Sequence, residues 1–180
     1  MIGPEANHAL AHYHPRSRHR RARVCPGDKQ ERAGIVNFSK VDAVVACGGA
    51  TDTAALDALK ADGFKAIINL RTAGEEGANL EQNAARAKEL GLKYISIPFS
   101  SGQPDPTAVD TFLGEIANTS NQPVFVHCGS ASRVGSFWLV KRVLQDGWTV
   151  EKATEEAKLI GLRSEPLEKF ALDYIAAHKK

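Results

Sequence analysis

The chain has 180 residues, of which 43% are hydrophobic and 24% charged, and its formal net charge at pH 7 is +2. This length and composition are typical of one globular domain with a full core. They exclude a membrane span, because no apolar run approaches about 18 residues, and the N-terminus shows no apolar signal segment. The three cysteines are far apart and fit neither a disulfide framework nor a paired zinc site, so we expect a cytoplasmic protein without metal or other cofactor.

Residues 1–34 are basic and have almost no apolar periodicity. They hold seven Lys or Arg residues against three acidic residues, a net charge of +4, and four of the six histidines. This composition predicts a disordered basic tail ahead of a folded domain at residues 35–180. The charge alone would allow contact with nucleic acid or a membrane surface. Such a composition more commonly belongs to a solvated tail without a binding role. Outside this tail we expect no contact with nucleic acid.

From about residue 35, strands and helices alternate along the chain. Short apolar or β-branched runs predict strands at residues 41–49, 64–71, 92–99 and 123–128. Capping residues and stop glycines predict helices at residues 51–63, 78–91, 106–117, 133–147, 149–161 and 164–178. The charged run 151–158 is expected to be a solvated helix face. This order predicts an α/β domain of three layers, a parallel sheet with right-handed crossovers and helices on both faces.

The stretch HCGSASR, residues 127–133, joins the last predicted strand to a helix. Reactive groups in parallel sheets gather at the carboxyl ends of the strands, which is where Cys128 falls. A cysteine at a helix N-terminus near a cation is favoured as the nucleophilic thiolate. Arg133 in the first helical turn offers a planar fork to a tetrahedral anion. Four small residues between them let the backbone N–H groups curl into an anion cradle: Gly129, Ser130, Ala131 and Ser132.

This loop resembles that of the cysteine-dependent protein tyrosine and dual-specificity phosphatases, whose pattern is His-Cys, five residues, then Arg followed by Ser or Thr. The runs LKADGFKAIINLR, YISIPF and PVFVHC are similar to those of the small bacterial branch, so the resemblance covers about residues 37–176. It implies a phosphatase-like fold, a phosphorylated substrate and Cys128 as nucleophile. It also implies that Arg133 and the backbone of residues 129–132 bind phosphate. His127 would tune the cysteine, and we count it among the residues that contact the substrate.

The sequence departs from that family pattern in three places. Four residues, not five, separate Cys128 from Arg133, Val stands where the hydroxyl residue follows the arginine, and serines stand where the family has its general acid. Asp105 is the nearest candidate for that acid. Its place before Pro106 is also that of a helix N-cap, which is the commoner role. Arg71 ends another predicted strand, where lining the pocket and solvating a turn are equally good interpretations.

The four-residue spacing also resembles the loop of rhodanese-type sulfurtransferases, in which the cysteine carries a persulfide and no acid is needed. Some bacterial proteins with a phosphatase-like fold and this shorter loop are associated with sulfide oxidation. The leading hypothesis is therefore a cysteine-dependent phosphatase acting on phosphate monoesters. The alternatives are a sulfurtransferase acting on a small sulfur-containing anion and a catalytically inactive anion-binding module. Cys47 is expected to be packed in the core, and Cys25 falls in the basic tail.

Overall fold

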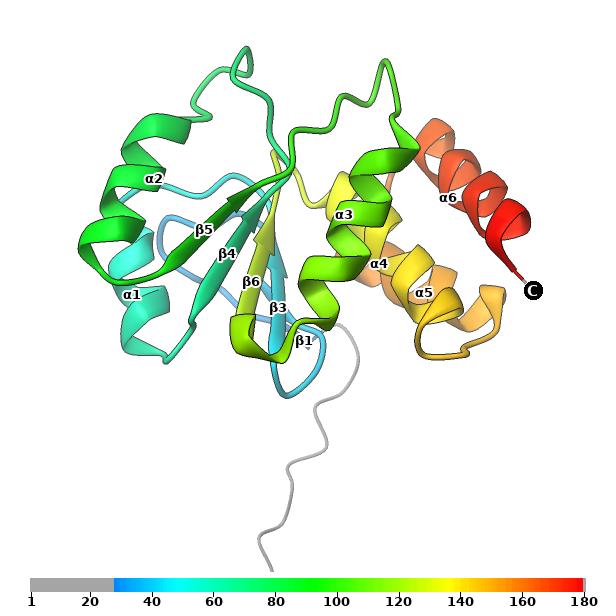
Figure 1. The fold of residues 1–180 in the computed structure, drawn as a ribbon, viewed down its shortest axis with the longest axis horizontal. Helices are drawn as coiled ribbons and strands as arrows, with labels where there is room; N and C mark the ends of the chain where they lie inside the picture. Colours follow the sequence, from blue (N-terminus) through cyan, green and yellow to red (C-terminus); the bar gives the residue numbers. More distant parts are fainter. Residues whose placement is uncertain (1–27, 180) are drawn as a thin grey trace, which may run out of the picture.

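The computed structural model of the protein describes residues 28–179, in which one sheet separates two groups of helices (Figure 1). The strand order is β1-β2-β3-β6-β4-β5. Four neighbouring strands, β3, β6, β4 and β5, run parallel to one another, as the alternation of strands and helices predicts. These four strands are β3 (Val45–Gly48), β6 (Val124–His127), β4 (Ala66–Asn69) and β5 (Lys93–Ser96).

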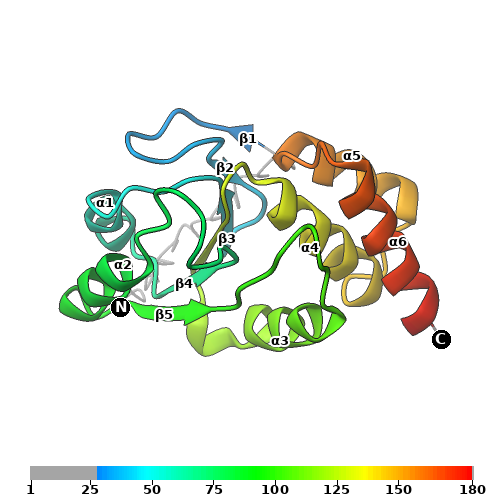
Figure 2. The ribbon, with the colours of Figure 1, turned by 90° about the horizontal axis from the view of Figure 1, so that it is seen from above.

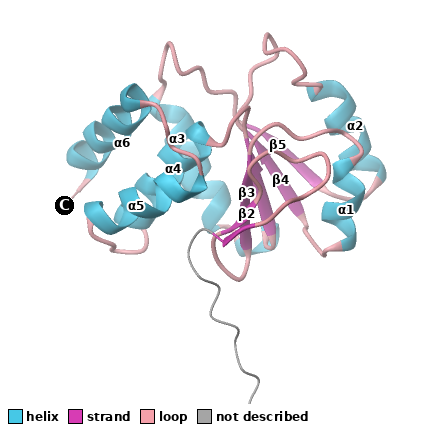
Figure 3. Cartoon of the chain, turned by 180° about the vertical axis from the view of Figure 1, so that it is seen from behind, coloured by secondary structure: helices cyan, strands magenta, loops and turns pink. Residues whose placement is uncertain are grey.

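Two short strands extend the sheet at the other edge and make it mixed. β1 (Asp28–Lys29) pairs antiparallel with β2 (Ser39–Lys40), which pairs antiparallel with β3; β2 lies beside β3 in Figure 3. Strands of two residues are too short for a periodic pattern, which is why the sequence does not predict them. The folded part therefore begins before the predicted boundary at residue 35. Residues 1–27 lie outside the described part, so the disordered tail stays a prediction there.

Helices cover both faces of the sheet, as predicted (Figure 2). One face carries α1 (Ala55–Ala61) and α2 (Leu80–Glu89). The other carries α3 (Pro106–Ala117), α4 (Ser132–Leu144), α5 (Val150–Ile160) and α6 (Glu165–His178), and a 3₁₀ turn, Thr119–Asn121, follows α3. No helix within residues 28–179 is long and apolar enough to cross a membrane.

Each face of the sheet has its own hydrophobic core, and successive strand residues alternate between the two cores. Ile67 and Phe125 pack with the residues of α1 and α2, whereas Ile68 and Val126 pack with those of α3 to α6. This alternation follows from the two-residue repeat of a strand. Because both faces are covered, the strands read as continuous apolar runs in the sequence.

Side-chain caps confirm three of the predicted helix starts. Asp105, Thr149 and Ser164 each accept a hydrogen bond from a backbone N–H in the first turn of α3, α5 and α6. The predicted start of the first helix at residues 51–52 is wrong, because α1 begins at Ala55 without a side-chain cap. Thr53 is used differently, since its hydroxyl donates to the side chain of Asn83 and ties α1 to α2.

A buried polar network joins the C-terminal half of α4 to α5. The guanidinium of Arg142 lies between the rings of Trp138 and Trp148, 4.6 and 4.3 Å from their centroids. Its Nε and Nη2 donate to the two carboxylate oxygens of Glu156 at 2.6 and 3.0 Å, and Trp138 Nε1 donates to the same carboxylate at 2.8 Å. Glu156 is only 2% exposed, so it does not belong to the solvated face expected for residues 151–158.

Candidate active site

Cys128 directly follows β6 at the carboxyl edge of the sheet, and α4 begins four residues later, as the sequence predicts. The residue is fully buried. Ala131 is the N-cap of α4 and has a left-handed backbone with φ of 72°. Within the described residues, the backbone N–H groups of residues 129–134 donate to no other group. They are therefore free to receive an anion, which is what a cradle at a helix N-terminus requires.

The connection between α5 and α6 supports this loop from behind. Ser132 Oγ accepts a hydrogen bond from the backbone N–H of Arg163 at 3.2 Å. Gly161 lies against the loop so closely that a Cβ placed on it would be 2.9 Å from Ala131 Cβ and 3.2 Å from the carbonyl oxygen of Ser130. A segment about thirty residues downstream thus helps to fix the shape of the loop.

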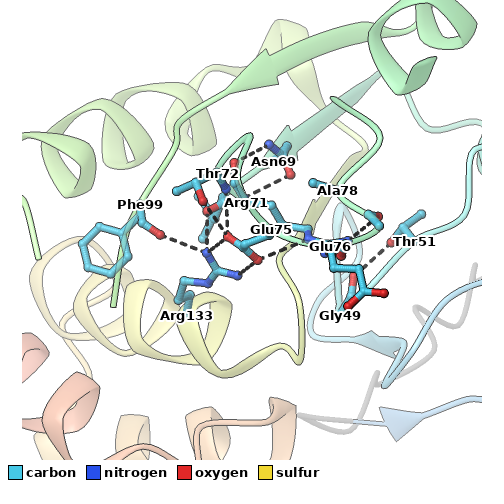
Figure 4. Close-up of polar contacts among 12 residues, drawn as sticks. Gly49, Thr51, Asn69, Arg71, Thr72, Glu75, Glu76, Ala78, Phe99 and Arg133 are labelled. Atoms are coloured by element: carbon cyan, nitrogen blue, oxygen red, sulfur yellow. Dashed lines mark hydrogen bonds and ion pairs between the residues drawn. The ribbon is translucent and has the colours of Figure 1, made fainter. Parts of the chain in front are cut away.

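Arg133 occupies a fixed position at the far end of the loop (Figure 4). Its Nη1 donates to the carbonyl oxygens of Leu70 and Phe99 at 3.1 and 2.9 Å. Nη1 and Nη2 also form a bidentate pair with the Glu75 carboxylate, each at 2.6 Å. Burial by itself would lower the pKa of Arg133, but hydrogen bonds and charge interactions with Glu75 and Cys128 outweigh it and raise the pKa. The arginine is therefore charged and close to the thiol.

Glu75 belongs to the site, although no sequence pattern predicted it. It lies in the loop between β4 and α2, where Thr72 N–H donates to Oε1 at 2.8 Å and Arg71 Nε donates to Oε2 at 3.3 Å. Burial opposes its ionisation, but the hydrogen bonds from Arg133 and from the Thr72 N–H lower its pKa to about 2. The available signal was its place just past the carboxyl end of a strand, beside the strand that carries the cysteine.

Arg71 does not line the pocket, and it does not extend into solvent at the turn either. It is 5% exposed, and its guanidinium donates to the carbonyl oxygens of Gly77 and Glu76 at 2.7 and 2.5 Å and to Glu75. These bonds close the turn that carries Glu75. Arg71 therefore reaches the site through Glu75 rather than through direct contact with a substrate, and both sequence interpretations need this correction.

His127 lies on the opposite face of β6 from Cys128. Its ring stacks on Phe125 with centroids 5.6 Å apart and an interplanar angle of 8°, and its Nδ1 has no partner among the described residues. Burial is the main cause that lowers the pKa of His127 to about 4, and the charge of Arg71 acts in the same direction. The imidazole is thus neutral near pH 7 and outside the pocket, so the expected substrate contact by His127 has no support in this placement.

The buried neutral imidazole predicts a pH-dependent stability. The pKa of His127 falls from 6.5 to about 4 on folding, so the unfolded chain binds a proton that the folded chain rejects between these values. Stability is then full above about pH 6.5 and decreases as the pH falls toward 4, by about 2 kcal/mol between pH 6.5 and pH 5. Urea unfolding at pH 7.5 and 5.0 measures this. The difference between the unfolding free energies at the two pH values should shrink in His127→Phe and persist in His178→Gln. An equal difference in both variants would contradict the prediction.

Asp105 lies at the start of α3 and acts as its N-cap. Its carboxylate accepts hydrogen bonds from the backbone N–H and the hydroxyl of Thr107 at 2.9 and 2.7 Å. These hydrogen bonds lower the pKa of Asp105. A general acid needs the opposite, a carboxyl group that keeps its proton near neutral pH. The exposed Asp105 also does not line the pocket, so the structure favours the capping role over the acid.

A pocket of about 390 Å³ lies over the loop. Its lining residues are Ser101, Gly129, Ser130, Ser132, Arg133, Arg163, Ser164 and Leu167. Three of the four predicted cradle residues and Arg133 thus meet there, while Ala131 and Cys128 are fully buried and are not among the lining residues. No carboxylate lines this pocket, and no group of three or more potential metal ligands occurs within residues 28–179. Arg163 was not predicted, because it follows the loop by 30 residues and no local motif marks it.

Comparison with solved structures places this fold among phosphatases. A putative phosphatase (DUF442) from Shewanella putrefaciens CN-32 aligns with a TM-score of 0.69 at 17% identity, over 82% of this chain and 94% of that one. The core catalytic domain of the PP-IP phosphatase SIW14 from S. cerevisiae gives 0.68 at 19%, over 80% and 88%. A variant of P. aeruginosa TpbA in complex with pTyr gives 0.65 at 17%, over 86% and 91%. At these identities the likeness shows the fold.

Comparison of sequences extends this likeness to a family. The beta-lactamase hydrolase-like protein of Agrobacterium fabrum (strain C58 / ATCC 33970) is 34% identical over 90 residues, which are 48% of this chain. The chain spans only 20% of the length of that relative. The family model of DSP-PTPase phosphatases fused to NAD+ kinase matches residues 22–170, which is most of the chain and includes the whole Cys128 loop. The chain therefore belongs to this PTP-NADK family, within the tyrosine and dual-specificity phosphatase superfamily.

Proposed function

We propose that the chain is a cysteine-dependent phosphatase that hydrolyses phosphate monoesters through a phosphocysteine on Cys128. The carrying observation is the loop itself. The six backbone N–H groups of residues 129–134 have no acceptor among the described residues; they directly follow a buried thiol and include that of the fixed, charged Arg133, beside a pocket. Such donors stabilise the equatorial oxygens of a phosphoryl group in transfer. The membership of a phosphatase family supports the same chemistry.

The reaction follows from these groups in two steps. The Cys128 thiolate attacks phosphorus, the S–P bond forms, and the P–O bond to the leaving group breaks. We expect the leaving oxygen to take its proton from solvent, because none of the described residues that line the pocket is a carboxylic acid. Water then attacks phosphorus, the S–P bond breaks, and inorganic phosphate and the thiolate are released. Arg133 and the loop amides hold the transferred group in both steps.

The missing acid favours substrates whose leaving group needs no proton. Aryl oxygens leave more readily as anions than alkyl oxygens, since phenols have pKa values near 10. We therefore expect aryl phosphates to be better substrates than alkyl phosphates. The pTyr bound to the similar TpbA structure supports a phosphorylated aromatic substrate.

The direct test is to trap the intermediate. The protein is mixed with p-nitrophenyl phosphate and quenched in acid, and the peptides are examined by mass spectrometry. A single phosphoryl group on Cys128 is expected, together with release of phosphate and p-nitrophenol. Steady phosphate release with Cys128 unmodified at every quench time would overturn the proposed intermediate.

Glu75→Gln should lower kcat/KM for p-nitrophenyl phosphate by about 10- to 100-fold. The charged, bidentate pair fixes the Arg133 guanidinium, and an amide retains the size of the side chain but offers only one acceptor oxygen. A displacement of about 1 Å in a binding group costs rate on the order of 100-fold. Steady-state kinetics measure the effect.

Glu76→Gln is the matched control for this variant. Glu76 is the next residue in the same loop, and its side chain is exposed. Its kcat/KM should stay within about threefold of the wild type, as for surface changes in general. Equal effects of the two variants would show that only the net charge of the loop matters, and would contradict a positioning role for Glu75.

Sulfur transfer is a second candidate, favoured by the four-residue loop and by the absence of a carboxylate in the pocket lining. The Cys128 thiolate would take the sulfane sulfur of thiosulfate, releasing sulfite, and cyanide would then accept that sulfur as thiocyanate. Thiocyanate production that disappears in Cys128→Ser would support it, and none above the variant would exclude it. Phosphate binding without either activity would support the inactive anion-binding module instead.

A further inference from the structure

Arg163 is a second arginine in the active-site pocket, supplied by the connection between α5 and α6. Its backbone N–H donates to Ser132 Oγ at 3.2 Å, which places it directly beside the loop. Its side-chain Nη1 donates to the carbonyl oxygens of Lys158 and Leu162 at 2.7 and 3.2 Å. Although the residue is exposed, its guanidinium is thus held by two fixed backbone groups.

The two arginines of the pocket differ in how their charge is balanced. Arg133 is paired with the Glu75 carboxylate, whereas Arg163 forms no ion pair with any described residue. Its Nε and Nη2 donate to nothing within residues 28–179, so the edge that usually binds an oxyanion is free. Among the described residues, the pocket therefore holds one neutralised cation for the transferred group and one cation without a counter-charge.

The pocket is also larger than one phosphoryl group requires. Its volume of about 390 Å³ corresponds to roughly a dozen water molecules at ~30 Å³ each. A phosphoryl group with its ester oxygen has five heavy atoms and leaves much of that space unfilled. The remaining wall includes Arg163 and Ser164 from the connection between α5 and α6 and Ser101 from the loop between β5 and α3. None of the described lining residues is acidic, and the Glu75 carboxylate beside Gly129 is paired with Arg133.

We propose that Arg163 forms a second anion subsite, so that the pocket prefers phosphate esters carrying another phosphate or carboxylate near the one that is cleaved. The first subsite is the Cys128 loop with Arg133, and its role in binding the cleaved phosphate rests on the proposed function. The second subsite is a binding feature and does not require turnover. Its ligand is an oxyanion of the substrate itself, matched to the planar fork of the guanidinium.

The kinetic test compares phenyl phosphate with hydroquinone bisphosphate, which differ by one phosphate. The wild-type protein should show about a tenfold higher kcat/KM for the bisphosphate, the scale of one charge-assisted hydrogen-bonded contact. In Arg163→Gln this ratio should fall to about one, and in Arg163→Lys it should be intermediate. Lys65→Gln removes the same charge just before β4, at the opposite edge of the sheet, and should keep the tenfold ratio. A wild-type ratio near one, or a ratio unchanged in Arg163→Gln, overturns the proposal.

A binding test separates this proposal from the proposed function. Calorimetry with Cys128→Ser, which carries no nucleophilic thiol at this position, compares inorganic pyrophosphate with inorganic phosphate. Pyrophosphate should bind about tenfold more tightly, and adding Arg163→Gln should remove the advantage. If this Arg163-dependent advantage is found but the wild-type protein releases no phosphate from p-nitrophenyl phosphate, the proposed function fails and the second subsite stands. Hydrolysis of aryl phosphates without any pyrophosphate advantage would sink the second subsite alone.

Discussion

Cys128→Ser should release phosphate from p-nitrophenyl phosphate at least about a thousandfold more slowly than the wild-type protein. The hydroxyl of serine stays protonated at neutral pH, so the variant has no anionic nucleophile, and loss of a covalent nucleophile costs other enzymes about a millionfold. Cys128 is fully buried and serine is no larger, so the loop should keep its shape. Phosphate release under steady-state conditions measures the loss.

Cys47→Ser is the matched control for this prediction. Cys47 belongs to β3, is fully buried, and lies opposite Val126 in the sheet register, two residues before Cys128. Burial, as the largest cause, raises the pKa of its thiol well above the usual value, so it stays a protonated packing residue. Once stability is matched by assay temperature, Cys47→Ser should retain activity within a few fold. Equal losses in both variants, or none in Cys128→Ser, would contradict Cys128 as the nucleophile.

Glu156→Ala should lower the free energy of unfolding by about 3–5 kcal/mol, the largest effect on stability that we expect from a single polar residue here. The carboxylate accepts from both Arg142 and Trp138 and is almost entirely shielded from water. Removing it leaves a buried guanidinium without its main counter-charge and an indole N–H without an acceptor. Urea unfolding at pH 7.5 measures the change.

Glu155→Ala is the control on the same helix, because its side chain is exposed. Its unfolding free energy should stay within about 0.5 kcal/mol of the wild type. The double variant Arg142→Met, Glu156→Leu should recover much of the loss, because buried ion pairs can often be replaced by apolar residues of similar size. A loss below about 1 kcal/mol in Glu156→Ala would mean that solvent reaches this network in solution.

The features that the sequence predicts well are the ones encoded by neighbouring residues. The four parallel strands appear as apolar runs, the caps at Asp105, Thr149 and Ser164 precede their helices directly, and the loop from Cys128 to Arg133 is a single short stretch. Local physical chemistry determines each of these. The α/β architecture then follows from the order of the elements.

The features that escaped prediction depend on residues far apart in the chain. The Glu75–Arg133 pair joins residues 58 positions apart, and Arg163 reaches the pocket only because two helices fold back over the loop. The place of Glu75 just past a strand end marks it as a candidate, but nothing in either local sequence marks the contacts themselves. Glu156 is different, because a helical repeat places it on the same face as Ala153, Ala157 and Ile160, all of them buried. That periodic signal was present, and the charged composition of the run obscured it.

Because Gly161 lies against Ala131, the conformation of the short loop depends on the connection between α5 and α6 as well as on the length of the loop. A residue inserted between Cys128 and Arg133 would lengthen the loop to the spacing of the wider superfamily, but the backbone would have to bulge. The space on one side is already occupied by the Gly161 turn, within 3.2 Å of the Ser130 carbonyl for any added Cβ. Converting this loop to the longer form would therefore require a matching change some thirty residues downstream, so the two segments are constrained to vary together.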